Sequence, residues 1–157
     1  MLQRFQTLFL AIIVVSMGIM MAMPLWEKTA LDGSQSIQLT ALRLTHQQGI
    51  SANITPVWYV ALLGAVVAGI AAFAIFQYRN RLRQALLCGI NSLVMTVLMG
   101  VLMYLIFGQS KDVFEPQNTG SFGYGFYALV VAMLSNVLAN RFIRRDEKFV
   151  KSQDRFR

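Results

Sequence analysis

The sequence predicts an all-α membrane protein, a bundle of four transmembrane helices with room for a short β-hairpin in its first outer loop. Four stretches without a charged residue indicate the spans, at about residues 5–26, 57–77, 85–107 and 122–140. Each is close to the roughly 20 residues that a helix needs to cross a hydrocarbon core. The chain is also 56% hydrophobic and only 13% charged, which leaves too little polar surface for a soluble domain of 157 residues.

The distribution of positive charge predicts the orientation. The net charge is +7, and Lys and Arg concentrate at Arg4, in residues 78–83 and in residues 141–157. By the positive-inside rule, both termini face the cytoplasm of a bacterium across its inner membrane. A basic protein can also bind nucleic acid, but charge held on one side of a membrane accounts for this pattern, so no nucleic-acid partner is expected.

The first stretch, residues 5–26, is interpreted as an uncleaved signal anchor. Arg4 followed by an apolar run is typical of a secretory signal peptide, whose apolar region is about 7–15 residues long. Here the run continues to Met23 and is followed by Pro24, which disfavours cleavage. We therefore expect the first helix to stay in the protein.

The first outer loop, residues 25–56, predicts a short hairpin. Asp32-Gly33 is a dipeptide that tolerates a tight turn, and Ile37 and Leu39 alternate with polar residues. The apolar positions then shift to even numbers at Leu42, which we interpret as a β-bulge. Residues 49–56 are predicted to be a turn segment that leads into the second span.

The remaining segments follow from their lengths. The loop at residues 78–83 is so short that the second and third spans must be antiparallel neighbours. Residues 108–125 show no clear periodicity and are predicted to form the second outer loop. The fourth span then continues without a stop signal into the basic cytoplasmic tail, residues 141–157. The whole chain is expected to form one membrane domain.

The spans contain no group that is typical of chemistry. Proton relays and ion pathways place charged residues inside a bundle, and the four stretches have none. The sequence has no nucleophile–base set and no phosphate-binding glycine loop, so neither an enzyme nor a cofactor is expected. Cys88 is the only cysteine and His46 the only histidine. His46 with Glu27 and Asp32 admits an outer metal site, but we expect a solvated loop histidine and no metal.

Polar residues nevertheless cluster in the cytoplasmic half of the third and fourth spans. This candidate intramembrane cluster comprises Asn91, Thr96, Asn136 and Asn140. Hydrogen bonds between helices are its simplest interpretation. The alternative is a pocket belonging to a small transporter or lipid-handling protein. Met95 begins a four-residue repeat of methionines on the third span, which we interpret as adaptable packing rather than a Cu(I) site.

The tail carries the densest pattern. Phe142, Phe149 and Phe156 recur every seven residues, so a helix would present one apolar stripe. Acidic and basic residues alternate around it, and the candidate partner-docking residues are Arg144, Arg145, Asp146, Glu147 and Arg155. A self-paired solvated helix and docking to a partner protein both fit this pattern. The positive charge also favours anionic lipid at the cytoplasmic face.

Several segments resemble one family. They include Gln3 to Thr7, Pro24-Leu25-Trp26, residues 78–91 and the tail from Asn140-Arg141 through Asp146-Glu147 to Arg157. The chain resembles an uncharacterised family of small four-span inner-membrane proteins found in Bacteroidota. The resemblance covers nearly the whole chain and implies a cytoplasmic-membrane location and a shared architecture, but no activity.

These observations predict an integral inner-membrane protein that is a non-enzymatic accessory or assembly subunit of a larger membrane complex. We expect a membrane protein partner, contacted through the tail and the first outer loop. The alternative function is a small transporter or lipid-handling protein.

Overall fold

The computed structural model describes residues 2–77, 80–110 and 119–154. These residues form four long helices and five strands. The helices are α1 (Leu2–Ala22), α2 (Trp58–Phe76), α3 (Arg81–Met103), which a π-helical segment η1 (Tyr104–Ser110) continues, and α4 (Tyr124–Asp154). The strands are β1 (Trp26–Thr29), β2 (Gln35–Leu39), β3 (Arg43–Gln48), β4 (Ser51–Pro56) and β5 (Ser121–Phe122).

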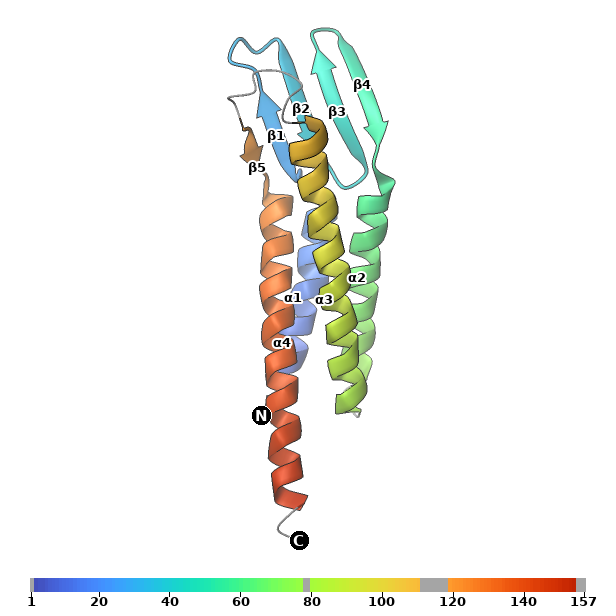
Figure 1. The fold of residues 1–157 in the computed structure, drawn as a ribbon, viewed down its shortest axis with the longest axis vertical. Coiled ribbons are helices and arrows are strands. Elements are labelled where there is room, and N and C mark those ends of the chain that lie inside the picture. Colours follow the sequence, from blue (N-terminus) through green and yellow to red (C-terminus); the bar gives the residue numbers. More distant parts are fainter. Residues whose placement is uncertain (1, 78–79, 111–118, 155–157) are drawn as a thin grey trace.

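The helices run side by side, and the sheet lies at one end of them (Figure 1). α1 and α3 each pack against both α2 and α4. The start of α1 and the end of α4 lie at the end opposite the sheet, where α4 extends beyond the other helices (Figure 1). In the described residues, three helices are long and apolar enough to cross a membrane: Trp58–Phe76, Leu82–Ser110 and Tyr124–Arg145. The apolar helix Gln6–Ala22 is shorter.

The prediction of an all-α four-helix membrane bundle is wrong, because a five-stranded antiparallel sheet accompanies the helices. Its order is β4-β3-β2-β1-β5. Four of the strands come from the first outer loop, and β5 comes from the residues before α4. A lone hairpin is marginal in water. Each strand here gains a neighbour, and one apolar cluster continues from the helices to Ile37 and Leu39 in β2.

Two local predictions for residues 25–56 are corrected by the sheet register. The turn at Asp32-Gly33 is present, and Gly33 has a φ of 70°. The expected bulge is instead a second chain reversal, in which the Thr40 N–H donates to the Arg43 carbonyl at 2.9 Å. The apolar parity shifts there because the chain turns back. Residues 51–56 are not a turn segment, since they pair with β3 from Ser51↔Gln48 to Pro56↔Arg43.

A compact junction joins the sheet to α4. The Trp26 indole N–H donates to the Thr119 carbonyl at 3.2 Å. The Gly123 N–H donates to the Leu25 carbonyl at 3.0 Å, and a Cβ added at Gly123 would lie 2.2 Å from the Pro24 carbonyl oxygen. Only glycine permits this close backbone approach. The start of α4 is therefore fixed against the end of the segment that leaves α1.

Lys28 does not lie in solvent, as an outer-loop cation would. Its side chain is only 1% exposed, and it pairs in register with Ile37 of β2. Trp26, two residues earlier on the same strand, is equally buried. Because alternate residues of a strand share a face, the inner face of β1 carries both an aromatic ring and a lysine.

Candidate functional site

The interior face of α3 places polar residues inside the bundle. Gln84, Cys88, Asn91 and Met95 recur every three or four residues, and all four are buried. This spacing puts them on one side of a helix. The same face continues upward as an apolar stripe through Leu98 and Leu102. The polar groups are therefore confined to the end of the bundle that lies away from the sheet.

Asn136 of α4 reaches across to this face. Its side-chain Nδ2 donates to the Cys88 backbone carbonyl at 3.0 Å. A carbonyl only accepts, so this bond fixes which end of the amide faces α3. The Asn136 side chain is 2% exposed, and its Oδ1 has no hydrogen-bond partner among the described residues.

Asn91 lies about one helical turn from Cys88 and is fully buried. In the described part of the chain, neither its Nδ2 nor its Oδ1 has a hydrogen-bond partner. A buried polar group left unpaired costs about 1–3 kcal/mol. Asn91 thus shares a buried face of α3 with Cys88, to which Asn136 is bonded, and three of the four side-chain polar atoms of Asn91 and Asn136 lack partners in the described residues.

The other two members of the predicted intramembrane cluster lie elsewhere. Thr96 is on the exposed side of α3, where its hydroxyl donates to the Ser92 carbonyl of its own helix at 2.9 Å. Asn140 is half-buried on α4, and its Oδ1 accepts from the Arg144 Nε at 3.1 Å. Asn140 therefore links the interior to the basic tail rather than facing α3.

Two glutamines that the sequence analysis did not single out are also buried. Gln84 donates through Nε2 to the Ala74 carbonyl of α2 at 3.2 Å, while its Oε1 is without a partner in the described residues. Gln6 of α1 is 2% exposed, and its Nε2 is likewise unpaired within the described chain. Gln6 precedes buried Leu10 and Ile13 at helical spacing. A polar residue in register with an apolar stripe was the signal that could have identified it.

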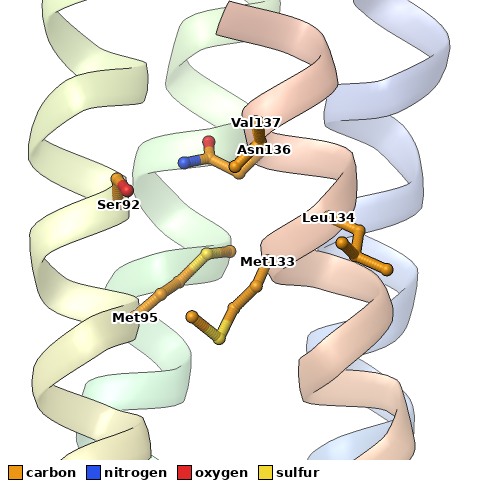
Figure 2. Close-up of a pocket in the computed structure, with 6 residues that line it drawn as sticks. All are labelled: Ser92, Met95, Met133, Leu134, Asn136 and Val137. Atoms are coloured by element: carbon orange, nitrogen blue, oxygen red, sulfur yellow. The ribbon is translucent and has the colours of Figure 1, made fainter.

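A pocket of about 180 Å³ lies beside these amides, between α3 and α4. Its lining residues are Ser92, Met95, Met133, Leu134, Asn136 and Val137. The two methionine side chains approach each other across the pocket, and Asn136 lies toward the tail end of α4, beyond them (Figure 2). Leu134 and Val137 are 61% and 60% exposed, so the pocket opens sideways on the outer surface of the bundle.

Comparison with protein-family models assigns the chain to a family. A family model described as a domain of unknown function, DUF4293, matches residues 2–156. The chain belongs to the DUF4293 family. The predicted membership of a family of unknown function is thereby confirmed. No curated protein matches this DUF4293 chain. The match includes the amides, the pocket and the sheet, so all of them belong to the one family domain.

The predicted tail residues are only partly described in this DUF4293 protein. Arg144 and Arg145 are exposed on α4, as is Arg141. The side chains of Asp146 and Glu147, and the whole of Arg155, lie outside the described residues. The helix itself continues to Asp154. The expected helical tail therefore continues α4 without a break in the described backbone.

The outer residues considered for a metal site do not gather in the DUF4293 fold. The Asp32 carboxylate accepts from the Ser34 N–H at 3.0 Å, and Glu27 accepts from the Gln38 side chain at 2.9 Å. His46 lies 3.4 Å from the Gln35 amide oxygen. Within the described ranges, no group of three His, Cys, Asp or Glu residues is placed to hold a metal ion. What the fold does offer is an apolar pocket with an amide at one end, and a five-stranded sheet at one end of the helices.

Proposed function

We propose that this protein is a non-enzymatic accessory or assembly subunit of a larger membrane complex, and that its outer sheet binds a partner by strand addition. The proposal rests on the exposed edge that strand β4 gives the sheet. This strand forms one edge of the sheet, and all six of its residues are exposed. Natural edge strands are commonly protected by Lys, bulges or shortness. β4 has no charged residue and only Pro56 at its end.

The membrane placement supports this role. We propose that α1 crosses the bilayer together with the three candidate spans, which gives four crossings and puts both termini on one side. The positive-inside rule then makes the tail side cytoplasmic, and the sheet faces the outside of the inner membrane. Resemblance to the Bacteroidota proteins supports this location. In this orientation β4 is accessible to periplasmic partners.

The backbone of β4 offers specific hydrogen-bonding groups to a partner. The Val57 N–H donates to the Leu42 carbonyl at 2.9 Å, on the β3 side of the strand. Backbone groups alternate in direction along a strand. Positions 51, 53 and 55 therefore face β3, and Ala52 and Ile54 direct their N–H and C=O groups to the open edge. An extended segment could bond to both residues, as in β-strand addition.

A second copy of this chain does not fit this edge by antiparallel pairing. The strands run roughly along the helices (Figure 1). Two copies inserted in the same direction are related by a two-fold axis along the membrane normal, which leaves the direction of β4 unchanged. Antiparallel pairing needs a two-fold axis perpendicular to the strands. We therefore propose a different polypeptide with an uncharged extended segment as the partner.

Purification of the tagged protein from its native membrane in mild detergent, with mass spectrometry, tests the proposal. Ile54→Pro removes one outward N–H without removing a bond to β3, and should release a partner that the wild-type protein retains at a fixed ratio. Ile54→Thr is the matched control, because it keeps the N–H and a β-branched side chain. Recovery of the wild-type protein with no partner, or equal retention by both variants, would contradict strand addition.

The tail is proposed as a second contact on the cytoplasmic side. Arg144 and Arg145 are exposed, which suits either a partner or anionic lipid. Reversing the charges of Arg144, Arg145, Asp146 and Glu147 together should release a cytoplasmic partner while the protein stays inserted. Retention of every partner after this change would show that these tail residues do not bind a partner.

A lipid-handling role is the second candidate function. The observation that favours it is the sideways pocket at Asn136, because a groove open to the hydrocarbon is accessible to lipid. It predicts that a variant with a filled pocket loses a lipid phenotype at a normal protein level. Partner retention by the same variant would separate this role from the subunit role.

A further inference from the structure

The pocket between α3 and α4 has the size of a small apolar ligand group. Its volume of about 180 Å³ slightly exceeds that of an engineered cavity of about 150 Å³ that binds benzene. Met95 and Met133 form much of the wall, and thioethers adapt to irregular shapes. A segment of an acyl chain therefore fits this space.

The amide at the end of the pocket specifies the polar part of the ligand. The Asn136 side chain is only 2% exposed, and its Nδ2 donates a hydrogen bond to the Cys88 carbonyl. The polar atom of this amide that has no partner in the described residues is the acceptor Oδ1, which lies on the side of the amide away from the two methionines (Figure 2). An acceptor requires an N–H or O–H donor. The ester linkages of a glycerol lipid have carbonyl acceptors only, so they cannot supply one.

Basic residues continue from the amide along α4. Asn136, Asn140 and Arg144 follow one another at four-residue spacing, so they share a face of the helix. The Arg144 Nε is held by the Asn140 Oδ1 at 3.1 Å. Arg141 is exposed and lies about one helical turn beyond Val137, which lines the pocket. Eight residues of helix place Arg144 roughly 12 Å beyond Asn136, toward the cytoplasm.

Depth within the bilayer fits the same ligand. Asn136 lies five residues, or roughly 7.5 Å, from Arg141. The interfacial region of a leaflet is about 5–8 Å thick. With Arg141 at the level of the head groups, Asn136 therefore lies where a lipid has its linkage between head group and chains. The apolar part of the pocket lies deeper still, at Met133.

We propose that this groove binds one cytoplasmic-leaflet lipid that has an anionic head group and an N–H or O–H donor in its linkage region. Arg144 and Arg141 bind the head group, Asn136 Oδ1 accepts from the linkage, and a chain enters the pocket between Met95 and Met133. The inference uses the proposed membrane orientation but not the subunit role. If the protein handles lipid, this inference names the class of lipid that it binds.

Two matched lipids test the proposal. Ceramide 1-phosphate and phosphatidic acid of equal chain length have the same head group, but only the ceramide has an amide N–H and a hydroxyl in its linkage. Each is titrated into the purified full-length protein in detergent, and binding is measured by native mass spectrometry. We expect ceramide 1-phosphate to bind about tenfold more tightly, the effect of one added hydrogen bond to an unpaired buried atom.

Single substitutions test which residue binds which part of the lipid. Asn136→Leu should abolish the preference between the two lipids, and Arg144→Gln should weaken both equally. Val137→Trp fills the mouth of the pocket from an exposed position and should weaken both lipids, whereas Leu138→Trp, exposed but outside the lining, should leave both unchanged. Protection of the Cys88 thiol verifies folding of each variant.

Three binding results would overturn the inference. They are equal binding of the two lipids by the wild-type protein, an unchanged preference in Asn136→Leu, and unchanged binding of both lipids in Val137→Trp. Crosslinking from position 137 to a helix of another membrane protein, in place of lipid, would also overturn it. None of these outcomes bears on β4, so failure of the lipid site and failure of strand addition are separately observed.

Discussion

Replacing Asn91 with Leu should stabilise the protein. Asn91 is fully buried, and both of its side-chain polar atoms lack a partner among the described residues. Each such atom costs about 1–3 kcal/mol in soluble proteins. Polar groups in membrane bundles have smaller effects, about 0.6 kcal/mol on average, because the separated helices also bury them. For two atoms we therefore expect a gain of about 1–2 kcal/mol from an apolar side chain of similar shape.

The assay uses the single cysteine. Cys88 is 1% exposed, so a thiol-reactive fluorophore reports unfolding when the purified protein is heated in detergent. A gain of about 1–2 kcal/mol corresponds to a rise in Tm of roughly 2–8 °C for a chain of this size. Asn136→Leu is the contrasting variant, since it removes the bond to the Cys88 carbonyl and should lower Tm. A fall in Tm for Asn91→Leu would refute the reasoning, because it would mean that the Asn91 amide is satisfied in the folded protein.

Two further predictions concern the sheet and its junction with α4. Gly123→Ala should destabilise the folded protein by about 1–3 kcal/mol, because the added Cβ would lie 2.2 Å from the Pro24 carbonyl oxygen. Gly18→Ala is the control in the same thermal assay. It should not lower Tm, because no atom lies within 4 Å of a Cβ added there. The Asp32 carboxylate accepts hydrogen bonds from the Ser34 N–H and hydroxyl, and these bonds lower the pKa of Asp32. The ionised carboxylate should therefore stabilise the turn above about pH 4, and this stabilisation should be lost as pH falls through the lowered pKa. NMR titration of the Ser34 amide signal measures this, and an unshifted Asp32 pKa would contradict it.

The helices were predictable because uncharged length is a strong signal. The second predicted span, residues 57–77, differs from α2 by one residue at each end. The first helix ends earlier than predicted, at Ala22 rather than near residue 26. Pro24 cannot continue the helical hydrogen bonds, and the Leu25 N–H instead donates to the Leu39 carbonyl of the sheet. That bond joins residues far apart in sequence, so periodicity could not predict it.

The sheet was mostly hidden from sequence patterns. Strand β4 alternates polar with apolar residues along its sequence, but all six residues are exposed, so this alternation does not mark a buried face. Its structure comes from pairing with β3, in a register that starts at the Gln48↔Ser51 pair. The shift of apolar parity near Leu42 was visible, but a bulge and a turn produce the same shift. The hydrogen bond from Thr40 to Arg43 and the antiparallel pairing of β2 with β3 distinguish them.

The candidate site was predictable in part. Asn91 and Asn136 were identified because an amide in an apolar span is conspicuous, and their depths permitted contact at one interface. Thr96 was grouped with them by sequence distance alone, although five residues of helix turn it about 140° from Asn91. Gln6 and Gln84 lie at the ends of their spans, where polar residues are ordinary, so only tertiary burial distinguishes them.

The unpaired polar atoms are unevenly distributed, and this bears on function. All five that the structure describes belong to Gln6, Gln84, Asn91 and Asn136, which lie in the half of the bundle away from the sheet. The half next to the sheet is closed by apolar contacts and by the glycine junction at Gly123. Sequences tend to break local rules at functional sites. Stabilisation by Asn91→Leu, together with loss of lipid discrimination by Asn136→Leu, would mean that the half of the bundle away from the sheet is less stable than it could be because it keeps hydrogen-bonding groups available in its interior.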